Sequence, residues 1–103
     1  MEQQISIDGN QVNIQLVGQM FDEDAVELQL KVSTYFEQGY NSFLLNMSKL
    51  DYIDSSGIAV LISLHKRLDA TGGRIVIADL QGVVKELFTV THLTTVFEIR
   101  PEA

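Results

Sequence analysis

A junction between an apolar strand and an apolar helix occupies residues 50–61, which read Leu50-Asp51-Tyr52-Ile53-Asp54-Ser55-Ser56-Gly57-Ile58-Ala59-Val60-Leu61. Asp54 or Ser55 can cap this helix, because a side-chain oxygen at the first position satisfies a free backbone N–H group. Ile53 and Ile58 have the spacing of a hydrophobic staple if Asp54 is the N-cap. The three polar side chains and the glycine exceed what one cap requires, and they lie where free N–H groups attract negative charge. We therefore expect this turn to do more than begin a helix.

The composition predicts one compact domain with an acidic surface. The chain has 103 residues and 46% hydrophobic content, which is enough to fill one core and too little for two. We therefore expect a single domain over residues 1–103. Fourteen acidic residues against seven basic ones give a formal net charge of −7, and no basic cluster exceeds the pair Lys66-Arg67. Because a phosphate backbone would be repelled, nucleic acid is not an expected partner.

Three observations predict a cytoplasmic protein. The sequence has no cysteine, so it offers neither disulfides nor thiolate metal sites. The start Met1-Glu2-Gln3-Gln4 lacks the basic and apolar regions of a signal peptide. The longest strongly apolar run, residues 58–62, is far shorter than the roughly 20 residues that a membrane span needs. We expect a reducing compartment and no direct membrane insertion.

The first half of the chain alternates between strand and helix periodicity. Apolar and polar residues alternate on either side of Asp8-Gly9-Asn10, which predicts an opening β-hairpin. We expect its second strand to end at Gly18. Helical spacing follows from Ala25 to Phe36, and Gly39 closes that helix.

The second half of the chain predicts further strands alternating with helices. Residues 43–47 are a short, mostly apolar run, which is typical of a strand buried on both faces. The helix that begins near Ser55 ends at Gly72-Gly73. We then expect a buried strand over residues 74–78, a short helix over residues 83–90 with Leu87 and Phe88 inward, and a final strand over residues 95–99. The order β-β-α-β-α-β-α-β predicts a mixed α/β (α+β) domain with one sheet of about five strands and three to four helices.

Catalysis has little support in the sequence. His65 follows Ser55 by ten residues on the same predicted helix, about 15 Å away, which is beyond hydrogen-bond reach. The second histidine, His92, has no local path to that serine, and the spacing G-x-S-x-G is absent. We expect no catalytic residue and no enzyme activity.

Metal and cofactor binding have simpler alternatives. The acidic residues Asp22, Glu23, Asp24, Asp51 and Asp54 could gather around Mg²⁺. Each lies at or near a predicted helix start, where a carboxylate favours free N–H groups without any ion. The glycines form no phosphate cradle. We expect no metal and no cofactor, and weak nucleotide binding stays open.

With Asp54-Ser55-Ser56-Gly57-Ile58-Ala59-Val60-Leu61 preceded by Leu50 and Ile53, the sequence resembles the STAS family and, within it, the bacterial anti-sigma factor antagonists. The resemblance covers nearly the whole chain. It includes the order of elements, Gly18, Gly72-Gly73, the helix around residues 84–88 and the following Thr91-His92-Leu93.

The resemblance implies a switch and not a catalyst. In this family the serine directly after the aspartate, here Ser55, is phosphorylated by an anti-sigma factor that is also a serine kinase. The unmodified protein binds that kinase and frees the sigma factor. Phosphorylation breaks the complex, and a PP2C-type phosphatase restores it. The implied switch and partner-binding residues are Asp22, Glu23, Asp24, Asp54, Ser56, Gly57 and Ile58. A phosphate of about −1.5 to −2 charge next to the acidic residues 22–24 predicts a basic partner surface.

Two positions depart from the family pattern. Many phosphorylated members have an aspartate three residues after the glycine that matches Gly18, but here that position is Phe21 and Asp22 follows it. Phe21 has the staple spacing to Val26 if Asp22 caps the first helix. Ala59 stands where a second glycine is frequent. The departure at Phe21 motivates an alternative, an unphosphorylated STAS interaction subunit of an ABC transport complex or a signalling scaffold. The sequence leaves the oligomeric state open.

Overall fold

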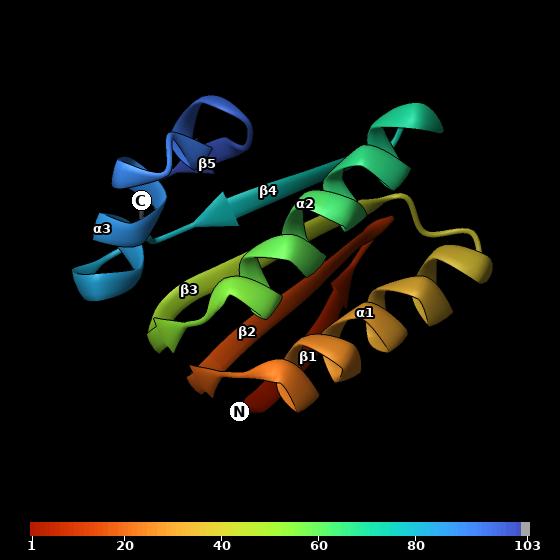
Figure 1. Ribbon diagram of the computed structural model, residues 1–103. Helices are drawn as coiled ribbons and strands as arrows, with labels where there is room; N and C mark the ends of the chain where they lie inside the picture. The colour runs from red at the N-terminus through yellow and green to blue at the C-terminus, as the bar shows by residue number, and fades with distance from the viewer. Residues whose placement is uncertain (102–103) are drawn as a thin grey trace.

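A five-stranded sheet forms the centre of the computed structural model, which describes residues 1–101 (Figure 1). The elements are β1 (Glu2–Asp8), β2 (Gln11–Met20), α1 (Asp22–Glu37), β3 (Ser42–Ile53), α2 (Ser55–Ala70), β4 (Arg74–Ala78), α3 (Gly82–Val90), the 3₁₀ turn η1 (Leu93–Thr95) and β5 (Glu98–Arg100). The strands lie side by side in chain order, with β1 antiparallel to β2 and the other neighbours parallel. The predicted mixed α/β fold and its element order are confirmed.

The hydrophobic core lies on one face of the sheet, where α1 and α2 cross it (Figure 1). Alternate residues of the two central strands are buried there: Val12, Ile14 and Leu16 from β2, and Phe43, Leu45 and Met47 from β3. Each strand therefore shows period-two burial, as expected when only one face is covered.

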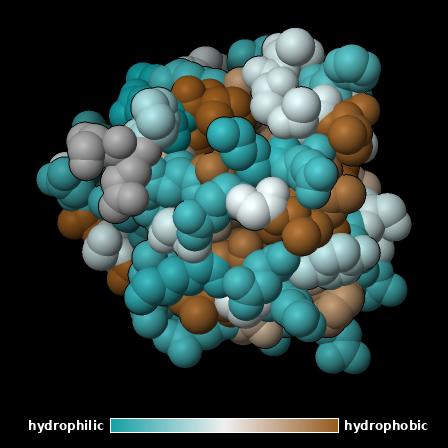
Figure 2. Space-filling model, turned by 90° about the vertical axis from the view of Figure 1, so that its left-hand side faces the viewer, coloured by the Kyte–Doolittle hydropathy of each residue, from teal (hydrophilic) through white to brown (hydrophobic). Residues whose placement is uncertain are grey.

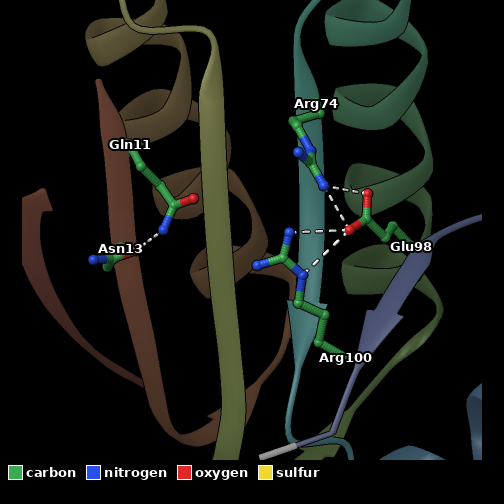
Figure 3. Close-up of polar contacts among 5 residues, drawn as sticks. All are labelled: Gln11, Asn13, Arg74, Glu98 and Arg100. Atoms are coloured by element: carbon green, nitrogen blue, oxygen red, sulfur yellow. Dashed lines mark hydrogen bonds and ion pairs between the residues drawn. The ribbon is translucent and has the colours of Figure 1, made fainter. Parts of the chain in front are cut away.

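The opposite face of the sheet is polar and partly exposed. Gln11 and Asn13 of β2 lie on it, as do Arg74 of β4 and Glu98 and Arg100 of β5, with the helices behind the strands (Figure 3). The amide of Gln11 donates to Asn13 at 2.7 Å, and both arginines pair with Glu98.

The prediction that residues 43–47 are buried on both faces is therefore wrong. Leu44 and Asn46 point to the polar face and are only partly buried. The strand is also longer than predicted, because β3 continues to Ile53. By contrast Ile75, Val76, Ile77 and Ala78 of β4 are all buried, as predicted.

Gly18 does not end the second strand, contrary to the prediction. β2 continues to Met20, and its pairing with β3 shifts register between Gln15 and Val17 and again between Gly18 and Gln19. Gly18 has a φ of 104°, a conformation that glycine adopts without a Cβ penalty. The glycine therefore marks an irregularity within the strand, and β2 reaches the start of α2.

The C-terminal region also differs in detail from the prediction. Thr95 belongs to η1, where its hydroxyl donates to the His92 carbonyl at 2.7 Å, and β5 begins only at Glu98. In α3 the buried residues are Val84 and Phe88, while Leu87 is partly buried. None of the helices in residues 1–101 is long and apolar enough to cross a membrane.

Candidate functional site

The turn from β3 into α2 is held by Asp54. Its backbone is extended, and its carboxylate accepts a hydrogen bond from the Gly57 N–H at 3.0 Å. Its own N–H donates to the Met20 carbonyl at 3.1 Å, which ties the turn to the end of β2. Of the two predicted caps the structure therefore selects Asp54, and α2 begins at Ser55. This places Ile53 and Ile58 at the two positions of a hydrophobic staple.

The two serines of the turn have different surroundings. Ser55 is the first residue of α2 and is exposed, and its hydroxyl has no protein partner within residues 1–101. Ser56 is partly buried, and its hydroxyl donates to the Asp22 carboxylate. The side chains of Asp54 and Ser56 thus make hydrogen bonds within the fold, while the Ser55 hydroxyl is left exposed for modification.

Asp24, and not Asp22, makes the side-chain hydrogen bond at the start of α1. Phe21 occupies the N-cap position, and the Asp24 carboxylate accepts a hydrogen bond from the Phe21 N–H at 3.0 Å. This is the reach-back contact of a capping box, made by the third residue of the helix. Asp22 is therefore not the N-cap that the possible staple of Phe21 with Val26 required, and its carboxylate instead contacts Ser56.

The three acidic residues that start α1 have separate roles. Asp24 also accepts from the amino group of Met1 at 3.0 Å. The hydrogen bond from the Phe21 N–H, helped by this amino group, holds the pKa of Asp24 below its usual value. Glu23 is exposed. The structure therefore brings Asp22 to the serine turn and holds Asp24 at the start of α1.

Gly57 is required by close packing and not by an unusual backbone angle. A Cβ added there would lie 2.6 Å from Ile53 Cγ1 and 2.8 Å from Met20 Sδ. Both neighbours are almost completely buried, so neither can move easily. Gly57 thus lets the first turn of α2 lie directly on the ends of β2 and β3, and Ile58 next to it packs partly buried against the core.

An exposed aromatic pair lies beside this turn, and the sequence reasoning did not find it. The rings of Phe21 and Tyr52 have centroids 5.8 Å apart. They come together because Gln19 pairs with Tyr52, and Met20 with Ile53, where β2 and β3 end. The sequence offered little signal for this pair, because Tyr52 lies five residues beyond the predicted end of its strand, and β3 continues to Ile53 only in the structure.

The protein is thus a mixed α/β domain in which an exposed serine begins a helix. The polar residues on either side of this serine both make hydrogen bonds within the fold. A family model described as the STAS domain matches residues 3–103. The chain belongs to the STAS domain family.

Similar proteins and solved structures bear related names. BtrV of Bordetella bronchiseptica, named as an anti-sigma factor antagonist, is 26% identical over 84 residues, which is 82% of this chain and 72% of that protein. The anti-sigma F factor antagonist of Lysinibacillus sphaericus is 29% identical over 84 residues, 80% of this chain and 71% of that protein.

Solved structures of the antagonist SpoIIAA have the same fold. Its unphosphorylated form superposes with a TM-score of 0.80 at 21% identity, covering 99% of this chain and 89% of that one. Its phosphorylated form, described as a Bacillus cell fate determinant, gives a TM-score of 0.81 at 21% identity, covering 99% and 92%.

Proposed function

We propose that this protein is an anti-sigma factor antagonist that is switched by phosphorylation of Ser55. Its unmodified form binds an anti-sigma factor that is also a serine kinase, and this releases the sigma factor. The observation that carries the proposal is the exposed hydroxyl of Ser55, which has no partner among residues 1–101 and lies between Asp54 and Ser56, which both have one. The names of the relatives support the same function.

A phosphate on Ser55 is compatible with the fold. The group adds about −1.5 to −2 charge, and the first turn of a helix favours negative charge. Ser55 is exposed and contributes nothing to the core, so the domain stays folded when it is modified. SpoIIAA, which has the same fold, has been solved in both forms.

Phosphorylation of Ser55 breaks the complex with the anti-sigma factor and leaves the fold intact. Asp22 and Glu23 already make the neighbouring surface acidic, so the partner surface is basic and is matched to the unmodified charge. Each loss of about 1.4 kcal/mol weakens binding tenfold, and one desolvated phosphate costs several such steps. Removal of the phosphate by a PP2C-type phosphatase restores binding.

The alternative, an unphosphorylated interaction subunit of an ABC transport complex or a signalling scaffold, has less support. It rested on Phe21 at the position where many phosphorylated members have an aspartate. Asp22 stands one position later, and its carboxylate contacts Ser56 and not the Ser55 hydroxyl. The antagonist is favoured instead by the names of the relatives. The proposed role is binding and release, with no reaction catalysed by this chain.

A displacement assay tests the proposal. A purified complex of the sigma factor with its anti-sigma factor kinase is mixed with wild-type protein, Ser55→Asp or Ser63→Asp. Ser63 is also exposed on α2, so it controls for an added charge on the same helix. We expect wild type and Ser63→Asp to release the sigma factor and Ser55→Asp to need at least tenfold more protein. Equal release by Ser55→Asp contradicts the switch, and no release by wild type contradicts the function.

A further inference from the structure

We infer that Phe21 and Tyr52 form an aromatic binding surface, called here the aromatic pair, for an apolar side chain that the anti-sigma factor presents beside basic groups. This inference rests on the proposed function and adds to it. It assigns part of the affinity to two residues that are not modified, and it states the chemistry of the segment that binds them.

The aromatic pair is unusual among the exposed residues of the molecule. Phe21 is 46% exposed and Tyr52 is 39% exposed, although both rings are large and apolar. The other large hydrophobic residues exposed in residues 1–101 are all aliphatic: Ile7, Val26, Leu30, Val83, Val90 and Val96. On the side of the molecule that faces the viewer in Figure 2, apolar surface forms separate patches within a mostly hydrophilic exterior.

The pair is fixed in place and adjoins the switch. Phe21 follows the last residue of β2, Tyr52 lies within β3, and the two strands are paired up to their ends. The rings are tilted by 43° and face one another at 5.8 Å, so each limits the movement of the other. Tyr52 precedes Ser55 by three residues, and Phe21 precedes Asp22, which contacts Ser56. Because three residues of chain span at most about 10 Å, a partner segment that covers Ser55 can extend to the aromatic pair.

Acidic residues define the kind of segment that fits. Asp51 precedes Tyr52, while Asp22 and Glu23 follow Phe21, and all three are exposed. A fully apolar partner would leave these carboxylates desolvated without a counter-charge. A segment with lysine or arginine on either side of an apolar side chain satisfies both parts of the surface, and a cation can also lie over an aromatic ring. Rigid aromatic residues are common among those that carry most of an interface's affinity.

This arrangement separates affinity from switching. The aromatic pair contributes contact in the unmodified complex, and Ser55 decides whether the complex can form. Removing a ring therefore weakens binding of the unmodified chain, whereas the rest of the fold and the Ser55 hydroxyl stay as they are.

Two substitutions test the inference without weakening the fold. Phe21→Ser removes the ring but places a favoured residue at the N-cap of α1, so thermal stability is kept or increased. Tyr52→Thr removes the other ring but keeps a β-branched residue in the strand. Phe21→Tyr and Tyr52→Phe keep both rings, and Val90→Ala removes an exposed apolar side chain from α3 as the matched control.

The probe is the purified anti-sigma factor kinase that wild type binds in the displacement assay, and the readout is its dissociation constant by calorimetry at two salt concentrations. We expect Phe21→Ser and Tyr52→Thr each to weaken binding about tenfold without a loss of melting temperature. Phe21→Tyr, Tyr52→Phe and Val90→Ala should stay within about twofold of wild type. Higher salt should weaken the binding of wild type.

The two proposals fail in different ways. If Ser55→Asp weakens binding while Phe21→Ser and Tyr52→Thr bind like wild type, the inference is overturned and the proposed function stands. A loss of affinity in Val90→Ala equal to that in Phe21→Ser also overturns it, because the effect is then not specific to the aromatic pair. If wild type binds no anti-sigma factor kinase, the proposed function fails and the inference fails with it.

Discussion

The carboxylate of Asp22 accepts a hydrogen bond from the hydroxyl of Ser56 and so joins two residues 34 positions apart in the chain. This contact links the start of α1 to the start of α2. It also makes the two adjacent serines unequal, because the Ser56 hydroxyl has a hydrogen-bond partner and the Ser55 hydroxyl has none in the part of the chain that the structure describes. The proposed switch depends on this difference.

The contact predicts a measurable coupling between Asp22 and Ser56. Asp22→Ala and Ser56→Ala should each lower the free energy of unfolding by less than about 1 kcal/mol, because the contact is largely exposed. The double variant should lose less than the sum of the two, since either change alone removes the hydrogen bond. Urea unfolding of the four proteins measures the coupling. Strictly additive losses, like those expected for the pair Glu23→Ala and Ser56→Ala, would show that the contact does not form in solution.

The cap at Asp54 predicts a larger effect on stability. Asp54→Ala leaves the Gly57 N–H without its acceptor and should cost about 1 kcal/mol, within the usual range for a lost N-cap. Asp54→Ser should recover most of this loss, because a serine hydroxyl caps nearly as well. The nearby Asp51→Ala removes an equal charge from an exposed position and serves as the control in denaturant titrations. A loss in Asp51→Ala as large as that in Asp54→Ala would contradict the capping role.

Gly57 predicts a conflict between helix propensity and packing. Alanine is favoured over glycine in a helix by about 1 kcal/mol, so propensity alone predicts that Gly57→Ala is stabilising. The added Cβ would meet Ile53 Cγ1 at 2.6 Å, and overpacking typically costs about 1–3 kcal/mol. We expect packing to prevail and the midpoint of thermal unfolding to fall by several degrees. Ser63→Ala on the exposed side of α2 is the control and should not lower it. A more stable Gly57→Ala would mean that α2 does not lie this close to the strands.

Asp24 predicts a component of stability that depends on pH. Its pKa in the folded protein is below the ordinary value of 3.8, mainly because of the Phe21 N–H. Its contribution to the free energy of unfolding is therefore fully present above pH 3.8 and is lost as the pH falls through the lower folded pKa. Asp24→Asn should be less stable than wild type at neutral pH, by about 1 kcal/mol, and the difference should shrink in acid.

The measurement for Asp24 is the free energy of unfolding across the acidic range. Glu23→Gln is the matched control, because it removes a neighbouring charge from an exposed position. An Asp24→Asn variant whose stability runs parallel to wild type down to the acid limit would contradict the hydrogen bond to the start of α1.

Features set by local sequence were the most predictable. The order of strands and helices and a cap by either Asp54 or Ser55 follow from residue types at short spacing, whereas the choice of Asp54 as the cap comes from the structure. The contact of Asp22 with Ser56 could not be predicted, since three consecutive acids at residues 22–24 look equivalent until one of them is seen to bond back to Phe21. The choice among them is made by helix geometry at the N-cap and by the tertiary approach of α1 to α2.

Errors in the predicted strands have a similar cause. Gly18 has the sequence character of a strand end, yet neighbouring strands continue the pairing beyond it to Met20. Leu44 made residues 43–47 look buried on both faces, although it lies on the polar side of the sheet. Whether a face is covered depends on where the helices cross, and short apolar runs do not contain that information.

Phosphate mapping tests the central claim most directly. Wild type, Ser55→Ala and Ser56→Ala are incubated with the anti-sigma factor kinase and ATP, and the modified peptide is located by mass spectrometry. The account predicts that wild type and Ser56→Ala incorporate phosphate on Ser55 and that Ser55→Ala incorporates none. Undiminished incorporation in Ser55→Ala, or phosphate found on Ser56 of the wild-type chain, would contradict it.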